Sequence, residues 1–518
     1  MTYDDELNDN FFDDELLDGN NFNEEGADGS NAHSAPFFDE NGIRFSTRGN
    51  IILSFPEGTT GRLVIPEGTE HLSADAFKLS GAVTELVIPS TLKTLHHNVF
   101  RKLSSLRSFT VHPDNIYFNT DSEGQILFNQ DFTKIIKVSC DCDNAHFPYG
   151  VSEIENYAFQ YCEKITNIVV PDTVTIVGTG AFAHCHNLRE ITLGPNTKKI
   201  PGWLFMDCPA LGQITIPNSV KRLGIGAFAQ CTSLKEVHLP DTLQAINGQC
   251  FADCVSLENI FLPISVKSVG DGAFDGCRNL VAINVDENNA KLSSENGLLY
   301  NTYQSQLIRC PENSRSFELP ELLSSITPSA FSGCHNLTSI NLPIYIINIP
   351  DYCFSDCTEL ESVSLPTNLI TIGSSAFEGC RKLNDLSLPP TLQSIGDYAF
   401  SGCTALEKID LPQNLSEIGS SNPKENKKNG CTFYGCSSLK ELYIPDKVTS
   451  LNEYCFGNCS SLQTIRIPYL IDYLNNDLFV GCDSLRKAIL ANPYTEIEVG
   501  TFSENVEIVF DNPIDKSV

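Results

Sequence analysis

Cysteine and histidine side chains form two clusters in this sequence that could bind a metal ion. One contains Cys140, Cys142 and His146, and the other is the run His184 to His186, with a cysteine between two histidines. Structural zinc sites normally use four thiolate or imidazole ligands at stereotyped spacing. The first cluster has no obvious fourth ligand nearby, and the cysteine of the second belongs to a periodic series. We therefore predict no metal site and no cofactor.

Acidic and amide side chains alternate from Asn119 to Glu123, ahead of Gly124, as they do at the start of an EF-hand calcium loop. The twelfth position of that loop is Gln130 rather than glutamate, and no helical pattern flanks it. Calcium binding is therefore not expected. The sequence also lacks P-loop, dinucleotide-binding, HExxH and GxSxG motifs, and its carboxylates are scattered. We predict that the protein is not an enzyme.

Most of the 20 cysteines share one position, three residues after a recurrent phenylalanine. These 13 are Cys162, Cys185, Cys208, Cys231, Cys254, Cys277, Cys334, Cys357, Cys380, Cys403, Cys436, Cys459 and Cys482. Side chains in one column of stacked repeats point the same way, so we expect reduced thiols that pack as small buried hydrophobes.

The phenylalanine recurs every 23 residues along most of the chain, so the protein is a repeat array. Its positions are Phe77, Phe100, Phe159, Phe182, Phe205, Phe228, Phe251, Phe274, Phe331, Phe354, Phe377, Phe400, Phe433, Phe456, Phe479 and Phe502. The spacing rises to 59, 57 and 33 at three places, where a repeat carries an insertion. No single unit could bury its own apolar residues, so the units must stack into one core.

The unit from Pro366 to Pro389 shows the elements expected in each repeat. Apolar positions alternate at its end, which predicts a short strand that pairs in parallel with its neighbours. The segment SSAFEGC around Phe377 is too short for an independent helix, so we expect one helical or 3₁₀ turn at most.

The pattern PxxLxxIGxxAFxxCxxLxxIxLP is nearly complete at residues 217–240, 343–366, 366–389 and 389–412. It resembles the BspA-like leucine-rich repeat family over most of the chain. The resemblance implies a leucine-rich repeat solenoid that is curved. It also implies surface proteins or antigens in bacteria and parasitic protists, with binding or adhesion rather than catalysis.

One solenoid between two tails is the organisation that we predict. The expected segments are an acidic disordered tail (1–36), the solenoid (37–510) and a C-terminal tail (511–518), with insertions at about 113–147, 286–319 and 420–429. β-rich runs follow a glycine turn at three places, after Gly42, Gly124 and Gly297, which predicts three equivalent β-hairpin insertions. The insertion at 420–429 carries Lys424, Lys427 and Lys428, the one basic cluster of the sequence.

The net charge of −31 makes nonspecific binding to nucleic acid or to anionic membranes unfavourable. Residues 1–40 alone contain 13 acidic residues and no Lys or Arg. The first residues have no features of a signal peptide, and no apolar run is long enough to span a membrane. These features predict a cytoplasmic protein, whereas the family resemblance implies the cell surface. The oligomeric state is left open.

Strand residues that face outward are the candidate binding residues. They lie ten positions after each phenylalanine and vary in type, whereas the inward positions are almost constant. We expect them on the concave face, the usual binding surface of a solenoid. Two adjacent-repeat pairs, His238 with Phe261 and Tyr443 with Arg466, have residue types typical of interaction hot spots.

Two functional interpretations remain open. The first is a non-catalytic scaffold that binds protein partners, such as host or matrix proteins, in the manner of an adhesin-like surface antigen. The second is an intracellular regulatory scaffold whose acidic tail, residues 1–36, modulates binding at the same face. An enzyme is the least favoured class, because no catalytic constellation supports it.

Overall fold

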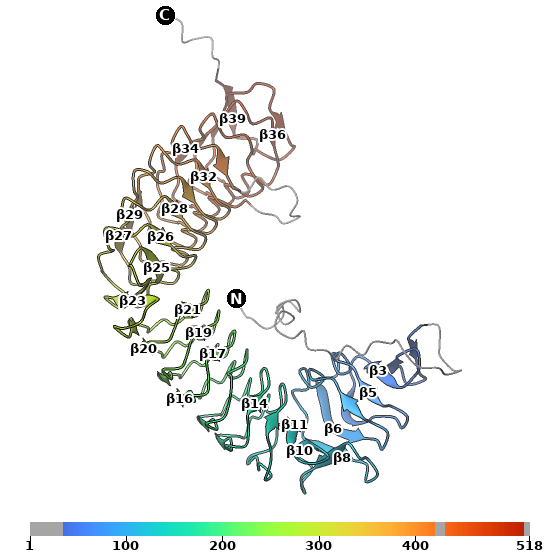
Figure 1. The fold of residues 1–518 in the computed structure, drawn as a ribbon. Coiled ribbons are helices and arrows are strands. Elements are labelled where there is room, and N and C mark those ends of the chain that lie inside the picture. The colour runs from blue at the N-terminus through green and yellow to red at the C-terminus, as the bar shows by residue number, and fades with distance from the viewer. Residues whose placement is uncertain (1–34, 420–429, 512–518) are drawn as a thin grey trace, which may run out of the picture.

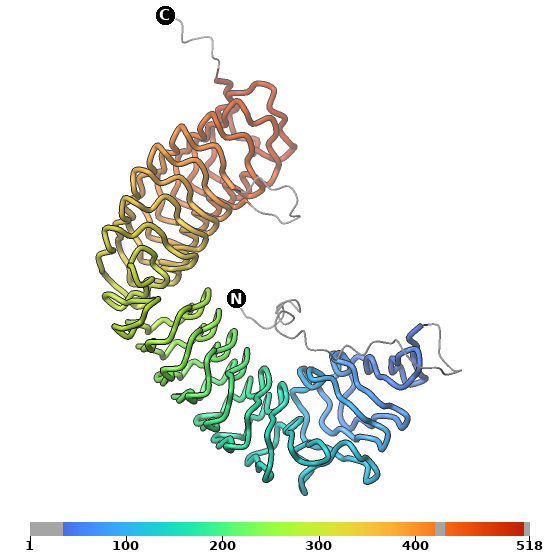
Figure 2. Tube along the Cα trace, in the orientation of Figure 1, coloured from blue at the N-terminus to red at the C-terminus, as the bar shows by residue number. Residues whose placement is uncertain are grey.

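The chain forms one curved solenoid, which the computed structural model describes over residues 35–419 and 430–511. Figure 1 shows an arc of stacked turns, and the tube in Figure 2 follows them one by one. The parallel solenoid predicted from the 23-residue period is confirmed. The predictions for residues 1–34, 420–429 and 512–518 lie outside the described ranges.

Most turns of the solenoid contribute to two columns of parallel strands. The outer column, along the outer edge of the arc in Figure 1, contains β4 (Thr60–Val64), β6 (Ala82–Ile88), β8 (Ser108–Val111), β13 (Asn167–Val169), β15 (Glu190–Thr192), β16 (Gln213–Thr215), β18 (Glu236–His238), β20 (Asn259–Leu262), β22 (Ala282–Val285), β27 (Ser339–Asn341), β29 (Ser362–Ser364), β31 (Asp385–Leu386), β34 (Glu441–Tyr443), β35 (Thr464–Ile467), β37 (Lys487–Leu490) and β39 (Glu507–Phe510). The inner column contains β5 (His71–Leu72), β7 (Thr94–Leu95), β12 (Glu153–Ile154), β14 (Ile176–Val177), β17 (Arg222–Leu223), β19 (Ala245–Ile246), β21 (Ser268–Val269), β26 (Ser325–Ile326), β28 (Asn348–Ile349), β30 (Thr371–Ile372), β32 (Ser394–Ile395), β33 (Glu417–Ile418), β36 (Tyr473–Leu474) and β38 (Glu496–Ile497).

Strand pairing is interrupted in both columns, at different turns. β15 does not pair with β16, nor β18 with β20, whereas β17, β19 and β21 form one sheet beside them. The inner column has breaks of its own: β26 does not pair with β28, whereas β27, β29 and β31 of the outer column form one sheet. Neither column is therefore one continuous sheet.

The predicted β-hairpins are confirmed at all three places, after Gly42, Gly124 and Gly297. The three sets are β1 (Phe37–Phe38), β2 (Arg44–Phe45) and β3 (Ile51–Ser54); β9 (Phe118–Thr120), β10 (Ile126–Asn129) and β11 (Lys134–Val138); and β23 (Leu292–Glu295), β24 (Leu298–Asn301) and β25 (Gln306–Arg309). Asn296 and Gly297 between β23 and β24 have φ of 52° and 80°, the left-handed pair that a tight hairpin turn requires. The last strand of each set joins the inner column in parallel, so each insertion replaces part of a turn.

The repeated phenylalanines form a stack through the centre of the solenoid, as predicted. From Phe159 to Phe274 neighbouring ring centroids lie 4.9–5.7 Å apart, and from Phe331 to Phe502 they lie 4.8–5.9 Å apart. Each ring therefore covers a face of the next one.

The hairpins divide this core into three clusters. On β24 the side chains of Leu298 and Tyr300 lie in the C-terminal cluster, and that of Leu299 lies in the central one. On β10, Leu127 lies in the N-terminal cluster while Ile126 belongs to the central one. Alternate residues of a strand point to opposite faces, so β10 and β24 each lie between two core clusters and form a wall that is buried on both sides.

The helical turn expected around Phe377 is wrong, because neither described range contains a helix. Ser375 and Gly379 have φ of 52° and 73°, which interrupts any right-handed helical run. The N–H groups of Ser375, Phe377 and Gly379 instead donate to carbonyl groups of the next turn at 2.7–2.8 Å. Backbone groups that a helix would satisfy internally thus join adjacent repeats.

The burial predicted for the cysteine column is confirmed, and the thiols have a second role. Cys380 Sγ donates to the carbonyl of Phe354 in the preceding repeat at 3.1 Å, and Cys403 Sγ donates to that of Phe377 at 3.2 Å. The contact recurs at 3.0–3.2 Å along both long runs of the column. Cysteine is therefore small enough for the core and still supplies a donor.

Replacing Phe377 by alanine should lower the free energy of unfolding by about 3–5 kcal/mol, because the fully buried ring would leave a cavity between two others. Phe261→Ala removes a ring that is 53% exposed and should change stability by at most about 0.5 kcal/mol. Denaturant unfolding of both variants tests this. Equal effects of the two substitutions would contradict the stack.

In the native protein, a thiol reagent should modify about one cysteine rapidly. Cys140 is partly exposed and the other 19 cysteines are buried, and burial raises the pKa of column thiols such as Cys403. Denaturation should release all 20 thiols. Counting them without reductant before and after denaturation tests this, and rapid reaction of many thiols in the native state would argue against the packing.

Candidate functional site

Tyr443 and Arg466 lie directly opposite each other in the parallel pair β34–β35. The Tyr443 residue is 50% exposed. Arg466, by contrast, contacts Asp446 at 2.8 Å and Asp511 at 3.5 Å, and donates to the carbonyl of Ile444 at 3.2 Å. Arg466 therefore ties the C-terminal turns together, and Tyr443 is the member of the pair that is available to a partner.

His238 and Phe261 lie in consecutive turns, on strands β18 and β20 that are not paired with each other. Their exposed fractions are high, and Phe261 stands opposite Asn284 in the pair β20–β22. A hollow of about 550 Å³ borders His238, lined also by Thr192, Thr215 and Pro217, where β15 and β16 separate. The open sheet thus offers a shallow, mixed polar and apolar surface.

The expected position of these residues on the concave face is wrong. All four belong to the outer column, which follows the outer edge of the arc in Figure 1. The sequence pattern shows which strand residues face solvent but not which way the stack bends.

The two cysteine and histidine clusters behave differently. Within residues 35–419 and 430–511 one group of three or more metal-ligating side chains lies within mutual reach, and it contains His184, His186 and Asp207. The cluster of Cys140, Cys142 and His146 is therefore not assembled. Cys185 is buried and donates to the carbonyl of Phe159 at 3.0 Å, away from its histidine neighbours. Asp207, missed in the sequence, stands 23 residues after His184 in the same register.

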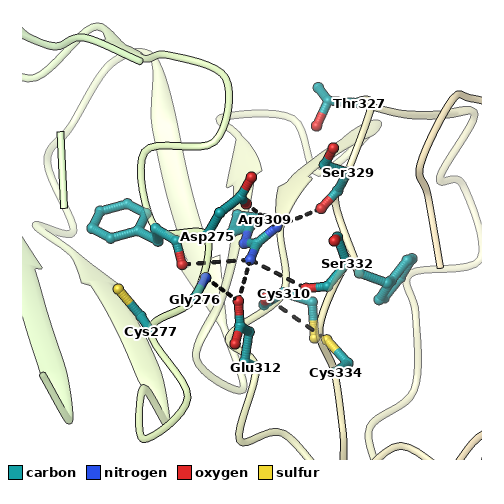
Figure 3. Close-up of polar contacts among 12 residues, drawn as sticks. Asp275, Gly276, Cys277, Arg309, Cys310, Glu312, Thr327, Ser329, Ser332 and Cys334 are labelled. Atoms are coloured by element: carbon teal, nitrogen blue, oxygen red, sulfur yellow. Dashed lines mark hydrogen bonds and ion pairs between the residues drawn. The ribbon is translucent and has the colours of Figure 1, made fainter. Parts of the chain in front are cut away.

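A buried ionic cluster, also missed in the sequence, lies where the second insertion meets the central turns (Figure 3). Arg309 contacts Asp275 at 2.8 Å and Glu312 at 3.1 Å. Its guanidinium also donates to the carbonyl groups of Ser329 at 2.5 Å and Ser332 at 3.2 Å. Arg309 and Glu312 are almost completely buried, so this cluster joins turns and does not face a ligand.

Lys137 holds the equivalent position in the first insertion. Its ammonium group donates to the carbonyl groups of Tyr157 at 2.8 Å and Gln160 at 3.0 Å, and the residue is fully buried. Burial lowers the pKa of Lys137. The sequence contains a signal for both buried cations. Each directly follows two apolar residues in the last strand of its hairpin set, Lys137 in IIKV and Arg309 in LIRC.

The buried cluster predicts a pH dependence of stability. Burial raises the pKa of Glu312 to about 8, against the opposing effects of Arg309 and the Gly276 N–H. The unfolded chain loses this proton near the ordinary glutamate pKa of about 4.3. Between about pH 4.3 and about pH 8 the folded chain therefore binds more protons than the unfolded chain. The resulting stabilisation is complete below about pH 4.3 and is lost as the pH rises through about 8.

Glu312→Gln should remove this component, because glutamine does not titrate. Between about pH 5 and about pH 8 the wild-type chain should lose at least about 1 kcal/mol of stability relative to the variant, since one pKa unit is worth about 1.4 kcal/mol. Urea unfolding at both pH values measures the difference. Parallel pH profiles would contradict the assignment.

Comparisons with known proteins agree with this fold. The description "BspA type Leucine rich repeat region (6 copies)" matches residues 59–138, 137–229, 198–318, 304–428 and 426–512. No curated protein matches the sequence.

Among solved structures, the chain is similar to a leucine rich cell surface protein from Faecalibacterium prausnitzii, at 20% identity over 90% of this chain and 96% of that chain, with a TM-score of 0.40. It is also similar to the pneumococcal vaccine antigen PcpA, at 18% identity over 93% and 95% of the two chains, with a TM-score of 0.45. The repeated match, which covers nearly the whole solenoid, shows that this chain belongs to the BspA-type leucine-rich repeat family.

Proposed function

We propose that this protein is a non-catalytic scaffold that binds protein partners through the outward residues of the outer strand column. The observation that carries the proposal is the contrast between the two faces of these strands. Inward residues such as Leu442 and Ile465 are buried. Outward residues such as Val169, Phe261 and Tyr443 are exposed and differ in side-chain type. Packing constrains the first set, and an exposed set of mixed type is suited to recognition.

The exposed apolar and aromatic residues support a protein partner rather than a small ligand. Val169, Phe261 and Tyr443 are all at least half exposed, and they belong to the same outer column, on β13, β20 and β34. The hollow beside His238 is shallow and open, unlike the enclosed pocket that a small molecule usually needs. The net charge of −31 favours a partner with a basic surface.

The finer form of the proposal is an adhesin-like surface antigen whose partners are host or matrix proteins. Family membership supports this form, and the alternative is an intracellular regulatory scaffold. The part of the chain that the structure describes contains no helix of the length and apolarity that membrane crossing requires.

Antibody labelling of intact and permeabilised cells tests the location. A surface antigen should be labelled on intact cells at a level close to that of permeabilised cells. Labelling that requires permeabilisation would contradict the surface form and support an intracellular scaffold.

A photo-crosslinking residue at position 443 should capture a partner in cells, and the same residue at position 473 should not. The positions form a matched pair, because Tyr443 and Tyr473 are 50% and 47% exposed and lie on the outer and inner columns. Mass spectrometry of the adducts measures the outcome. Adducts at position 473 alone would assign binding to the inner face, and none at either position would count against both faces.

A further inference from the structure

Four polar side chains from three consecutive turns converge on one edge of the solenoid. His184 Nδ1 lies 3.0 Å from Asp207 Oδ2, and His186 Nε2 lies 2.9 Å from the same oxygen. The other nitrogen of His186, Nδ1, lies 2.6 Å from Glu163 Oε1. One carboxylate oxygen thus stands between two imidazoles, and a second carboxylate supports one of them.

We propose that His184, His186 and Asp207 bind one Zn²⁺ ion. Their three ligand atoms all lie within 4.8 Å of one another. Zinc bonds to nitrogen and oxygen of about 2.0–2.2 Å in tetrahedral geometry place neighbouring donors roughly 3.3–3.5 Å apart. The contacts of 2.9 and 3.0 Å at Asp207 are therefore only a few tenths of an ångström short of that spacing.

The donor set is that of a site with an open position. Two imidazoles and one carboxylate are three protein ligands, which leaves the fourth zinc position to water or to an external ligand. The side chains of His184 and His186 are partly exposed, so an ion can enter from solvent. The thiol of Cys185 does not contribute, because it is buried and bonded to the carbonyl of Phe159.

Glu163 supplies the support that a zinc-bound histidine normally has. A carboxylate that accepts the Nδ1–H of His186 holds the tautomer in which Nε2 carries a lone pair toward the metal. Glu163 is one turn before His186 in the same register, as Asp207 is one turn after His184. The 23-residue period therefore supplies a ligand and its support from neighbouring turns.

The backbone holds these residues before any ion binds. Tyr161, His184 and Asp207 occupy the left-handed position of successive turns, with φ of 66°, 57° and 54°. Their N–H groups donate to the carbonyl groups of the following turn at 3.2, 2.8 and 2.8 Å. The ring of Tyr161 also stacks on that of His184 at 4.9 Å. A fixed spacing between turns limits the movement of the ligands and favours binding.

The site does not depend on the proposed binding function, and it predicts a stoichiometry. Chelator-treated full-length protein titrated with Zn²⁺ alone, in competition with a chromophoric chelator, should bind one tight equivalent. His186→Gln or Asp207→Asn should weaken binding more than tenfold, and Glu163→Gln by about tenfold, the usual effect of losing such a support.

His335→Gln is the matched control, because His335 follows its column cysteine as His186 does and belongs to no cluster of three or more metal ligands in the described parts of the chain. It should bind zinc like the wild type. The visible spectrum of the Co²⁺ form should show tetrahedral coordination without a thiolate charge-transfer band. Denaturant unfolding confirms that each variant is folded.

Three outcomes would overturn the proposal. They are the absence of a tight equivalent in the wild type, unchanged affinity in folded His186→Gln and Asp207→Asn, and a thiolate band in the Co²⁺ spectrum. The first would leave a hydrogen-bonded His–Asp–His cluster, and the other two would place the ion elsewhere.

Discussion

Each phenylalanine ring in the core of this protein is covered by the rings of the turns before and after it. Phe377 illustrates this, with ring centroids 5.3 Å from Phe354 and 5.5 Å from Phe400. The N–H of the same residue donates to the carbonyl of Ala399, and its carbonyl accepts a hydrogen bond from the thiol of Cys403. Apolar packing and polar satisfaction therefore both require the neighbouring turn, so a single turn has no stable fold.

Curvature places one strand column on the inner side of the arc and the other on its outer side. The outer column places Tyr443, Phe261 and the hollow beside His238 at the surface. The hairpin walls and their buried cations, Lys137 and Arg309, join the core clusters at the two insertions. The proposed binding surface therefore consists of outward residues that core packing does not constrain. At the two insertions, by contrast, buried cations with several partners fix how neighbouring turns join.

Much of the fold was predictable, because packing repeats at a fixed period. The Phe column, the strand at the end of each unit and the hairpins after Asn296 and Gly297 follow from local patterns. The turn around Phe377 was not predictable in detail, because its N–H groups bond to the next repeat. The candidate site was harder to predict from the sequence. Asp207 and Glu163 join His184 and His186 only through stacking, and the direction of curvature has no local signal.

The coupling between neighbouring rings tests the central claim most directly. A double-mutant cycle of Phe354→Ala and Phe377→Ala, with free energies of unfolding from denaturant titration, should give a coupling of about 0.5–1.5 kcal/mol. Phe182→Ala, in the central core cluster and remote from this pair, should add independently to Phe377→Ala within about 0.5 kcal/mol. Additive effects for the neighbouring pair would contradict a core that exists only through stacked turns.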